Sequence, residues 1–450
     1  MCHQLLKINL LVLVLFTFSA LANAQQSLDN LIDRDIAALV VNYKALHAAP
    51  ELSHYEEKTS AFVAKELRAL GYTVIERLGK YGRPEWKGYG VVGVMKNGPG
   101  LTVLVRSDMD ALPVEEKTGL PYASKVRTKN DAGQDVGVMH ACGHDIHITS
   151  LLGTARLLAE LKDQWQGTLV LVGQPAEETI DGARAMLNDG LYDQIPHPDY
   201  ALALHDDGDL EAGTLGVTPG FALSNATSVE IIVRGIGGHG SRPEAAKDPV
   251  VLAAQIVLAL QTIVSREVAP LDPAVVTVGS IHGGTRANII PEEVKLQLTV
   301  RSYKEEVRRK ILASIERIAK GTALAAGFPD ELAPVVKMSE TEVTPATFND
   351  PVLTERLTAV FTKLIGKDKV RTVAPIMASE DFGRFGLPNN QIPTVMFWLG
   401  AADPAVLAEN KRTGKTIPSL HSPLFAPLPE PTIRTGVKAM TAAVLELMKK

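Results

Sequence analysis

The chain has 450 residues, of which 46% are hydrophobic and 22% charged, and its formal net charge is -5. A chain of this length and apolar content can build two domains with separate cores. Because it contains no block rich in lysine and arginine, neither nucleic acid nor an anionic membrane surface is an expected partner.

Residues 1–24 have the layout of a secretory signal peptide. Lys7 precedes the apolar run LLVLVLFTFSAL, and Ala22-Asn23-Ala24 offers small residues for cleavage after Ala24. The run is shorter than the roughly 20 residues that span a bilayer, which favours cleavage over anchoring. We expect an exported protein, periplasmic or fully secreted. The mature chain would keep one cysteine, Cys142, which burial or a metal would protect in an oxidising compartment.

The first half of the chain predicts a sheet covered by helices. Residues 28–70 are predicted helical with a break at Ala49-Pro50, and apolar runs at 101–105, 168–172 and 200–204 predict buried strands. Helical segments such as 146–161 separate the strands, so a mostly parallel sheet in an α/β fold, with helices on both faces, is expected. Ligands bind beyond the carboxyl ends of such strands, where this chain places Asp108, Asp110, Glu177, Glu178 and His205.

From about residue 219 the pattern changes to alternating strands. Strands around 229–233, 274–281 and 294–300 are interspersed with helices near 248–265 and 304–326. The order β-α-β-β-α-β predicts a small ferredoxin-like α+β domain. A helix at 351–365, a strand at 394–400 and a helix at 432–448 would then return to the first domain. We therefore expect a catalytic domain over 25–218 and 339–450, with an inserted lid domain over 219–338.

The stretch MHACGHDIH at 139–147 carries a thiol and three imidazoles. Gly143 permits a tight turn that aims the Cys142 sulfur and a His144 nitrogen at one point. The adjacent Glu177 and Glu178 can diverge in a loop, so that one binds a metal and the other holds a water. Taken singly, each signal also has an ordinary explanation: a buried inert cysteine, or an acidic turn exposed to solvent.

Together, the motifs resemble a known family. RSDMDALPVEE, MHACGHDIH, GQPAEE, His205, ASEDFGRF at 378–385 and LHSPLF at 420–425 follow one another in the chain. This order resembles the amidohydrolase branch of the aminoacylase and carboxypeptidase-G-like metallopeptidases, which includes hippurate hydrolases, auxin-conjugate amidohydrolases and N-acyl-amino-acid amidohydrolases. HAAPELSHYEEKT at 47–59 and GVVGVMKNGPG at 90–100 extend the resemblance over nearly all of the mature chain.

The resemblance implies a site for two divalent metal ions, held by Cys142, His144, Glu178, His205 and His421. Cys142 would bridge both ions, and Glu177 would be the general base. Asp110 stands where relatives have an aspartate that orients a ligand, and Asp108 stands where many have a metal-binding histidine. Thiolate, imidazole and carboxylate ligands suit zinc or manganese, expected first, and also cobalt or nickel.

The resemblance also assigns roles within the inserted domain. The segment at 238–243 resembles a lid segment whose histidine, here His239, stabilises the developing oxyanion, often from the partner subunit of a homodimer. Asn288 would touch the substrate from a second lid segment. Arg286 would either bind a substrate carboxylate or face solvent. No role follows for His140 and His147, which we expect to be packing residues.

The expected function is hydrolysis of the amide bond of small N-acyl amino acids, with Glu177 activating the water. A dipeptidase or carboxypeptidase with the same metal ligands is an alternative. A non-catalytic metal- or solute-binding protein is another, although it would not need Glu177. In a third, Cys142 is a nucleophile with His144 as base, and activity would survive removal of metal.

Overall fold

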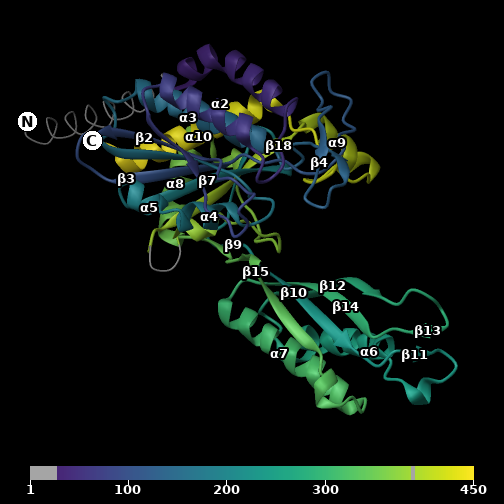
Figure 1. Cartoon of the computed structure of the whole chain (residues 1–450). Helices are drawn as coiled ribbons and strands as arrows, with labels where there is room; N and C mark the ends of the chain where they lie inside the picture. The colour runs from purple at the N-terminus through teal and green to yellow at the C-terminus, as the bar shows by residue number, and fades with distance from the viewer. Residues whose placement is uncertain (1–27, 387–390) are drawn as a thin grey trace, which may run out of the picture.

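The computed structural model describes residues 28–386 and 391–450, so the predicted signal peptide lies outside the described residues. Figure 1 shows a larger domain, in which both ends of the described chain lie, and a smaller domain that projects from it. The short strands β9 (Gly220–Leu223) and β16 (Thr347–Asn349) pair where the chain passes between the two domains.

The larger domain is built on an eight-stranded mixed sheet in the order β1-β2-β6-β3-β7-β18-β8-β17. Its strands are β1 (Thr73–Leu78), β2 (Gly90–Asn97), β3 (Thr102–Asp108), β6 (Gly167–Gln174), β7 (Tyr200–Glu211), β8 (Leu215–Val217), β17 (Val370–Thr372) and β18 (Thr394–Ala402). The central four, β6, β3, β7 and β18, are parallel, and every residue of β3 and β18 is buried. Burial on both faces explains why these strands read as continuous apolar runs.

Helices cover both faces of this sheet. The first helix (28–47), α2 (Glu57–Ala69), α3 (His144–Glu160), α8 (Pro351–Ile365) and α10 (Pro429–Met448) share one core with the sheet. On the opposite face, α4 (Gly182–Asn188), α5 (Leu191–Gln194) and the 3-10 helix Phe382–Gly386 contribute to a second core. The hairpin of β4 (Arg127–Lys129) and β5 (Asp135–Gly137) and the exposed helix α9 (Pro404–Thr413) complete the domain. The α/β fold class predicted from the sequence is confirmed.

The smaller domain has a four-stranded antiparallel sheet in the order β12-β14-β10-β15. Along the chain β10 (Asn225–Arg234), α6 (Pro249–Thr262), β12 (Ala274–Gly283), β14 (Glu293–Ser302), α7 (Glu305–Ala325) and β15 (Val335–Thr344) follow the expected β-α-β-β-α-β order. Alternate residues of β10 and β14 are buried against the two helices, and the opposite face of the sheet is open. The last strand runs past residue 338, so the sheet spans a longer segment than the sequence-based division allows.

Among the described residues, one helical stretch, Pro249–Glu267, is long and apolar enough to cross a membrane, with a mean hydropathy of 1.6. It consists of α6 and a π-helical turn, Ile263–Glu267. Its inner side supplies Leu252, Ile256 and Leu260 to the core of the smaller domain. Only 33% of the stretch is buried, which leaves apolar side chains of α6 uncovered.

Candidate active site

The predicted polar residues meet at the carboxyl ends of the central strands. Asp108 ends β3, and Glu177 and Glu178 follow β6. Because Arg106 pairs with Ala203 in the β3–β7 register, His205 lies level with Asp108. Here the expectation that β7 ends just before His205 was wrong. The strand continues to Glu211 because β18 keeps pairing with it, with Trp398 opposite His205.

Cys142 and His144 reach the same point from the start of α3. His144 is the first residue of that helix, two residues earlier than the sequence predicted. Gly143 has a φ of 73°, and a Cβ at this position would lie 2.1 Å from Asp206 Oδ2. Only glycine fits both the left-handed backbone and the space, so the turn predicted between the two ligands is sterically required.

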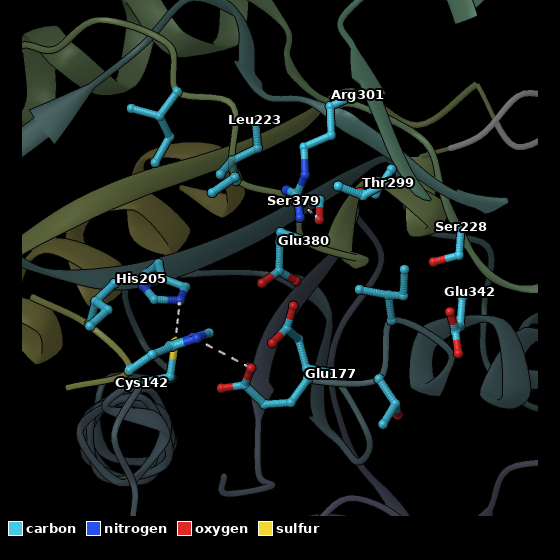
Figure 2. Close-up of a pocket in the computed structure, with 18 of the residues that line it drawn as sticks. Cys142, Glu177, His205, Leu223, Ser228, Thr299, Arg301, Glu342, Ser379 and Glu380 are labelled. Carbon is cyan, nitrogen blue, oxygen red and sulfur yellow. Dashed lines mark hydrogen bonds and ion pairs between the residues drawn. The ribbon is translucent and has the colours of Figure 1, made fainter. Parts of the chain in front are cut away.

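Cys142 is common to two groups of metal-ligating atoms. The donor atoms of Cys142, His144 and His205 lie within 4.8 Å of one another, and so do those of Cys142, Glu178 and His421. Cys142 Sγ is 3.6 Å from His205 Nε2, and Figure 2 shows the two side chains side by side. His421 Nε2 is 3.5 Å from a Glu178 oxygen. The five expected ligands thus converge, with the thiol between two sets.

Hydrogen bonds to backbone carbonyls orient His144 and His205 so that the Nε2 atom of each faces the ligand cluster. His144 Nδ1 is 2.8 Å from the Asp110 carbonyl oxygen, and His205 Nδ1 is 2.8 Å from the Asp206 carbonyl oxygen. Since carbonyls only accept, both Nδ1 atoms carry the proton and each Nε2 keeps its lone pair.

Two donor atoms at the centre of the cluster are left without partners. His144 Nε2 and Glu178 Oε1 are buried and have no hydrogen-bond partner among the described residues. Buried polar atoms are normally paired, so these two fit ligands of a divalent cation. One thiol, three imidazoles and a carboxylate are also a set of donors that binds divalent cations.

Without a cation the cluster is electrostatically unfavourable. Burial and the neighbouring Glu178 and Glu177 raise the pKa of the Cys142 thiol. Burial raises the pKa of Glu178 to about 8, with Asp110 acting in the same direction. Burial alone would lower the pKa of His144, but Asp108 and Asp110 raise it. Bound cations favour the ionised thiol and carboxylate and would relieve this repulsion.

Glu177 lies beside the ligands, and its carboxylate forms a further group of potential donor atoms with His144 and Glu178. Its Oε2 is 3.8 Å from His144 Nε2, and Figure 2 shows its carboxylate facing that of Glu380. Burial, followed by the charge of Glu380, raises the pKa of Glu177. A buried carboxylate with a raised pKa next to a metal site is suited to accept a proton from water.

A buried arginine supports the acids beneath the cluster. Arg106 is 2.6 Å from Asp108 Oδ2, 2.6 Å from Glu380 Oε1 and 3.2 Å from Asp381 Oδ1. Sequence reasoning missed Arg106 and Glu380 as site residues. The available signal was a charged residue at the end of the otherwise apolar strand LTVLVR.

Asp108 and Asp110 support the ligands in different ways. Both oxygens of Asp108 are engaged, one by Arg106 and the other by His147 Nδ1 at 2.6 Å. Asp110 accepts the Ser53 hydroxyl at 2.6 Å, and one of its oxygens lies 3.3 Å from His144 Nδ1. The geometry therefore gives Asp110 the position of a residue that orients His144, and Asp108 that of a supporting acid.

His147 and His140, for which no role was expected, differ in their hydrogen bonding. His147 links Asp108 to Asp206, whose Oδ1 is 3.1 Å from His147 Nε2, so it belongs to the support of the site. His140 is buried with neither ring nitrogen paired among the described residues. Burial lowers the pKa of His140 to about 4, so it is neutral, as a packing residue should be.

A cavity of about 600 Å³ opens over the cluster, between the two domains. The apolar part of its wall comprises Leu223, Ile376, Trp398 and Leu420. The polar part comprises Ser228, Thr299, Arg301 and Ser379. Arg301, on β14, donates to the Met377 carbonyl at 2.9 Å and to Ser379 Oγ at 3.2 Å. It has no carboxylate partner among the described residues, and Figure 2 shows it reaching into the cavity. Sequence reasoning missed Arg301 too.

The three residues expected from the lid segments are not brought to this cavity within one chain. His239 lies on β11 (Gly238–His239), and Arg286 and Asn288 precede β13 (Ile289–Ile290). These paired strands lie at the end of the smaller domain that is remote from the larger one (Figure 1), and all three residues are exposed. Of the two alternatives for Arg286, a substrate carboxylate or solvent, its exposed position within one chain fits the second.

Comparisons with known proteins agree with this geometry. The chain is 39% identical over 342 residues to the hippurate hydrolase of Campylobacter jejuni, covering 76% of this chain and 82% of that protein. It is 35% identical over 410 residues to thermostable carboxypeptidase 1 of Saccharolobus solfataricus, covering 90% and 94%. The structure of a dinuclear metal-binding peptidase of the M20 family from Bacillus subtilis superposes with a TM-score of 0.72 at 26% identity, covering 92% and 99%.

The match to the family model extends through both parts of the larger domain. The model described as peptidase family M20/M25/M40 matches residues 104–446, a segment that includes all five expected metal ligands and Glu177. Members of this family are metal-dependent hydrolases that act on amide bonds. With the fold, the ligand cluster and this match in agreement, the chain belongs to the M20/M25/M40 peptidase family.

Proposed function

We propose that this enzyme hydrolyses the amide bond of N-acyl amino acids, with Glu177 as general base. The observation that carries the proposal is the arrangement around Cys142, whose thiol is common to two ligand groups while Glu177 stands beside both. The resemblance to a hippurate hydrolase supports this class of substrate.

The chain's own residues account for the proton transfers. Two divalent ions held by the five ligands would polarise the amide carbonyl and lower the pKa of a water molecule. Glu177 takes a proton from the attacking water as its oxygen bonds to the carbonyl carbon. When the carbon–nitrogen bond breaks, Glu177 passes that proton to the departing amine.

The cavity wall orients such a substrate. Arg301 offers a guanidinium that has no acid partner in the described part of the chain, which suits the carboxylate of an amino acid. Leu223, Ile376 and Trp398 offer apolar surface for other parts of the substrate. An N-acyl amino acid carries both a carboxylate and an apolar group, and the cavity has a counterpart for each.

Zinc or manganese is the proposed metal, with cobalt and nickel as further candidates. The Cys142 thiol, common to both ligand groups, and three imidazoles would favour zinc, cobalt or nickel, and the Glu178 carboxylate would also suit manganese.

Hydrolysis of small peptides is the second candidate function. The carboxypeptidase of Saccharolobus solfataricus resembles this chain over 94% of its own length, and a peptide also presents an amide and a carboxylate. The amidohydrolase proposal stands first because the hippurate hydrolase is the more nearly identical of the two relatives.

We also propose that the enzyme is a homodimer formed through the smaller domain. Apolar side chains of α6 stay uncovered in one chain, Leu258 being 73% exposed and Val251 56%. β11, which carries His239, and β13, which directly follows Asn288, lie at the end of the smaller domain remote from the larger domain that holds the metal ligands (Figure 1). A second copy that covers α6 would explain the first feature, and delivery of His239 to the partner's cavity would explain the second.

The proposed location is the periplasm, with full secretion as the alternative. The support is the signal-peptide pattern of residues 1–24. Cell fractionation with a tagged chain tests it, and retention of the tag in the cytoplasm with residues 1–24 intact would contradict export.

The test of function measures release of free amino acid from N-acetyl, N-benzoyl and N-aminoacyl amino acids. Metal-loaded wild type should cleave one of these classes, and chelated protein should not. Glu177→Gln should keep both metals while losing about 10²- to 10⁴-fold in kcat. If the loaded wild type binds metal and cleaves no amide in the panel, the proposal fails. Activity that survives chelation would instead indicate Cys142 as a nucleophile.

A further inference from the structure

The loop that carries the two glutamates has an unusual backbone at both ends. Ala176, directly before Glu177, has a φ of 51°, and Ile180, two residues after Glu178, has a φ of 53°. Neither residue is a glycine, and a β-branched residue such as isoleucine rarely adopts this region. The conformation in which Glu177 and Glu178 diverge must therefore be held by contacts from outside the loop.

Glu56 supplies one of these contacts. Its carboxylate is fully buried, and Oε1 accepts the backbone N–H of Ala176 at 2.7 Å and that of His54 at 3.1 Å. The carboxylate thus ties the first strained residue of the loop to the segment between the first helix and α2.

His54 supplies a contact at the other end of the loop. Its Nε2 lies 3.1 Å from Asp181 Oδ1, which also accepts the Thr179 hydroxyl at 2.8 Å. The His54 ring is fixed by stacking on Trp86, with ring centroids 3.7 Å apart and planes 4° from parallel. His54 itself has a φ of 71°.

The same short segment also holds the acid next to the loop. Ser53 donates its hydroxyl to Asp110 Oδ2 at 2.6 Å, and that oxygen accepts the Glu178 backbone N–H at 2.9 Å. Residues 53–56 therefore contact the glutamate loop before Glu177, at Glu178 through Asp110, and after Ile180.

We propose that Glu56 and His54 are positioning residues that hold the glutamate loop in the conformation in which Glu178 faces the metal ligands and Glu177 faces the attacking water. This inference rests on the proposed function, since it takes Glu177 as base and Glu178 as ligand. Neither Glu56 nor His54 touches the cavity, and both act only through Ala176 and Asp181.

The test compares Glu56→Ala with Glu51→Ala as a matched control. The Glu51 carboxylate lies in the same segment and also accepts backbone N–H groups, those of Lys58 and Thr59, but makes no contact with the glutamate loop. Both variants should lower the melting temperature. Glu56→Ala alone should also weaken metal binding, measured by chelator competition, and lower kcat, each by about 10- to 100-fold, with KM little changed.

Two further variants, one at Glu56 and one at His54, separate a positioning role from a loss of stability. Glu56→Gln retains a carbonyl acceptor for the Ala176 N–H and should recover most of the metal affinity and kcat. If Glu56→Ala is too unstable to purify, the variant His54→Asn is tested in its place. This substitution removes the imidazole ring that contacts Asp181, and asparagine tolerates the positive φ at this position. Loss of metal affinity and kcat in His54→Asn would then support the proposal.

The inference is overturned if Glu56→Ala, or His54→Asn in its place, keeps wild-type metal affinity and kcat while losing only thermal stability, as the control does. That outcome is distinct from failure of the proposed function, in which wild type itself releases no amino acid. Metal affinity is measured without substrate, so it tests the positioning role even then.

Discussion

Arg301 enters the cavity from the smaller domain, and among the described residues its hydrogen bonds go to a carbonyl and a hydroxyl. If it binds the substrate carboxylate, Arg301→Ala should raise KM by about 10- to 100-fold with a smaller effect on kcat, since a hydrogen bond to a charged group is worth roughly 1.5–3 kcal/mol. Steady-state kinetics on N-benzoylglycine would measure this. The matched substrate N-benzoylglycinamide has no carboxylate, and an equal loss with both substrates would contradict the assignment.

His47 gives a residue-scale prediction for stability. Its ring lies between Asp145, 2.7 Å from Nδ1, and Glu116, 3.1 Å from Nε2. Burial lowers the pKa of His47, but the two carboxylates outweigh it and raise that pKa to about 10. Because the folded pKa lies above the value of about 6.5 for an unfolded histidine, the stabilisation is complete below pH 6.5 and is lost as the pH rises through 10.

The free energy of unfolding of wild type should therefore exceed that of His47→Gln most at pH 6, and the difference should shrink between pH 6.5 and 10. Urea unfolding at pH 6, 8 and 10 would measure it. His197→Gln, at an exposed position, serves as the control and should show a small and constant difference. A difference for His47→Gln that grows with pH would contradict the role assigned to the two carboxylates.

At the residue scale, site residues that lie in short motifs could be predicted from the sequence. Site residues that only the fold brings together were missed. Cys142, His144 and Glu178 occur in recognisable local patterns, and the structure places them within one cluster. Arg301 lies in none of these motifs, and Glu380, although it stands in ASEDFGRF, was given no role there, because neither local pattern indicates that the two residues share a cavity. His239 was expected from a motif to stabilise the oxyanion, often from a partner subunit, and this role stays a prediction because one chain does not bring β11 to the cavity.

The crossing of α3 and α10 is the element-scale feature on which the site depends, because α3 begins at His144. Gly153 of α3 lies against α10, where an added Cβ would be 2.4 Å from Val437 Cγ2 and 3.0 Å from Leu39 Cδ1. Gly153→Ala should therefore lower the free energy of unfolding by about 1–3 kcal/mol through overpacking. Chemical denaturation of the metal-loaded protein would measure this.

The matched control for this prediction is Gly321 in the exposed face of α7. A Cβ there would meet nothing within 4 Å. Gly321→Ala should raise the free energy of unfolding by about 0.5–1 kcal/mol, because alanine favours the helix. If both substitutions stabilise the protein, the helix crossing is looser than the structure shows.

Helices and strands were predicted correctly where their burial produces a clear pattern of apolar residues in the sequence. β3, β6 and β18 are buried on both faces and were predicted from apolar runs, and α8 was predicted at its observed bounds. β1 was missed because most of its residues are exposed or half-buried, so TVIERL carries neither an apolar run nor a clean alternation. β7 was predicted too short because its acidic continuation is held by pairing with β18, a contact remote in sequence.

At the scale of the whole molecule, the uncovered face of α6 predicts a dimer. Leu258 is 73% exposed, so Leu258→Lys should leave the fold of one chain intact while placing a charge in the proposed interface. Light scattering after size exclusion should then show a dimer for wild type and a monomer for the variant. A monomeric wild type, or a variant that stays dimeric, would contradict an interface at this face.

Exchange of subunits tests whether His239 acts on the partner's site. Glu177→Gln and His239→Ala should each be nearly inactive as pure dimers, because every cavity would lack either its own base or the partner's histidine. In a mixed dimer, the subunit that keeps Glu177 receives His239 from its partner, so one cavity is complete. An equal mixture that exchanges freely should thus regain about a quarter of wild-type activity, since half of the dimers are mixed and each has one working site. If His239 served its own chain, every cavity in the mixture would lack one of the two groups, and no activity would return.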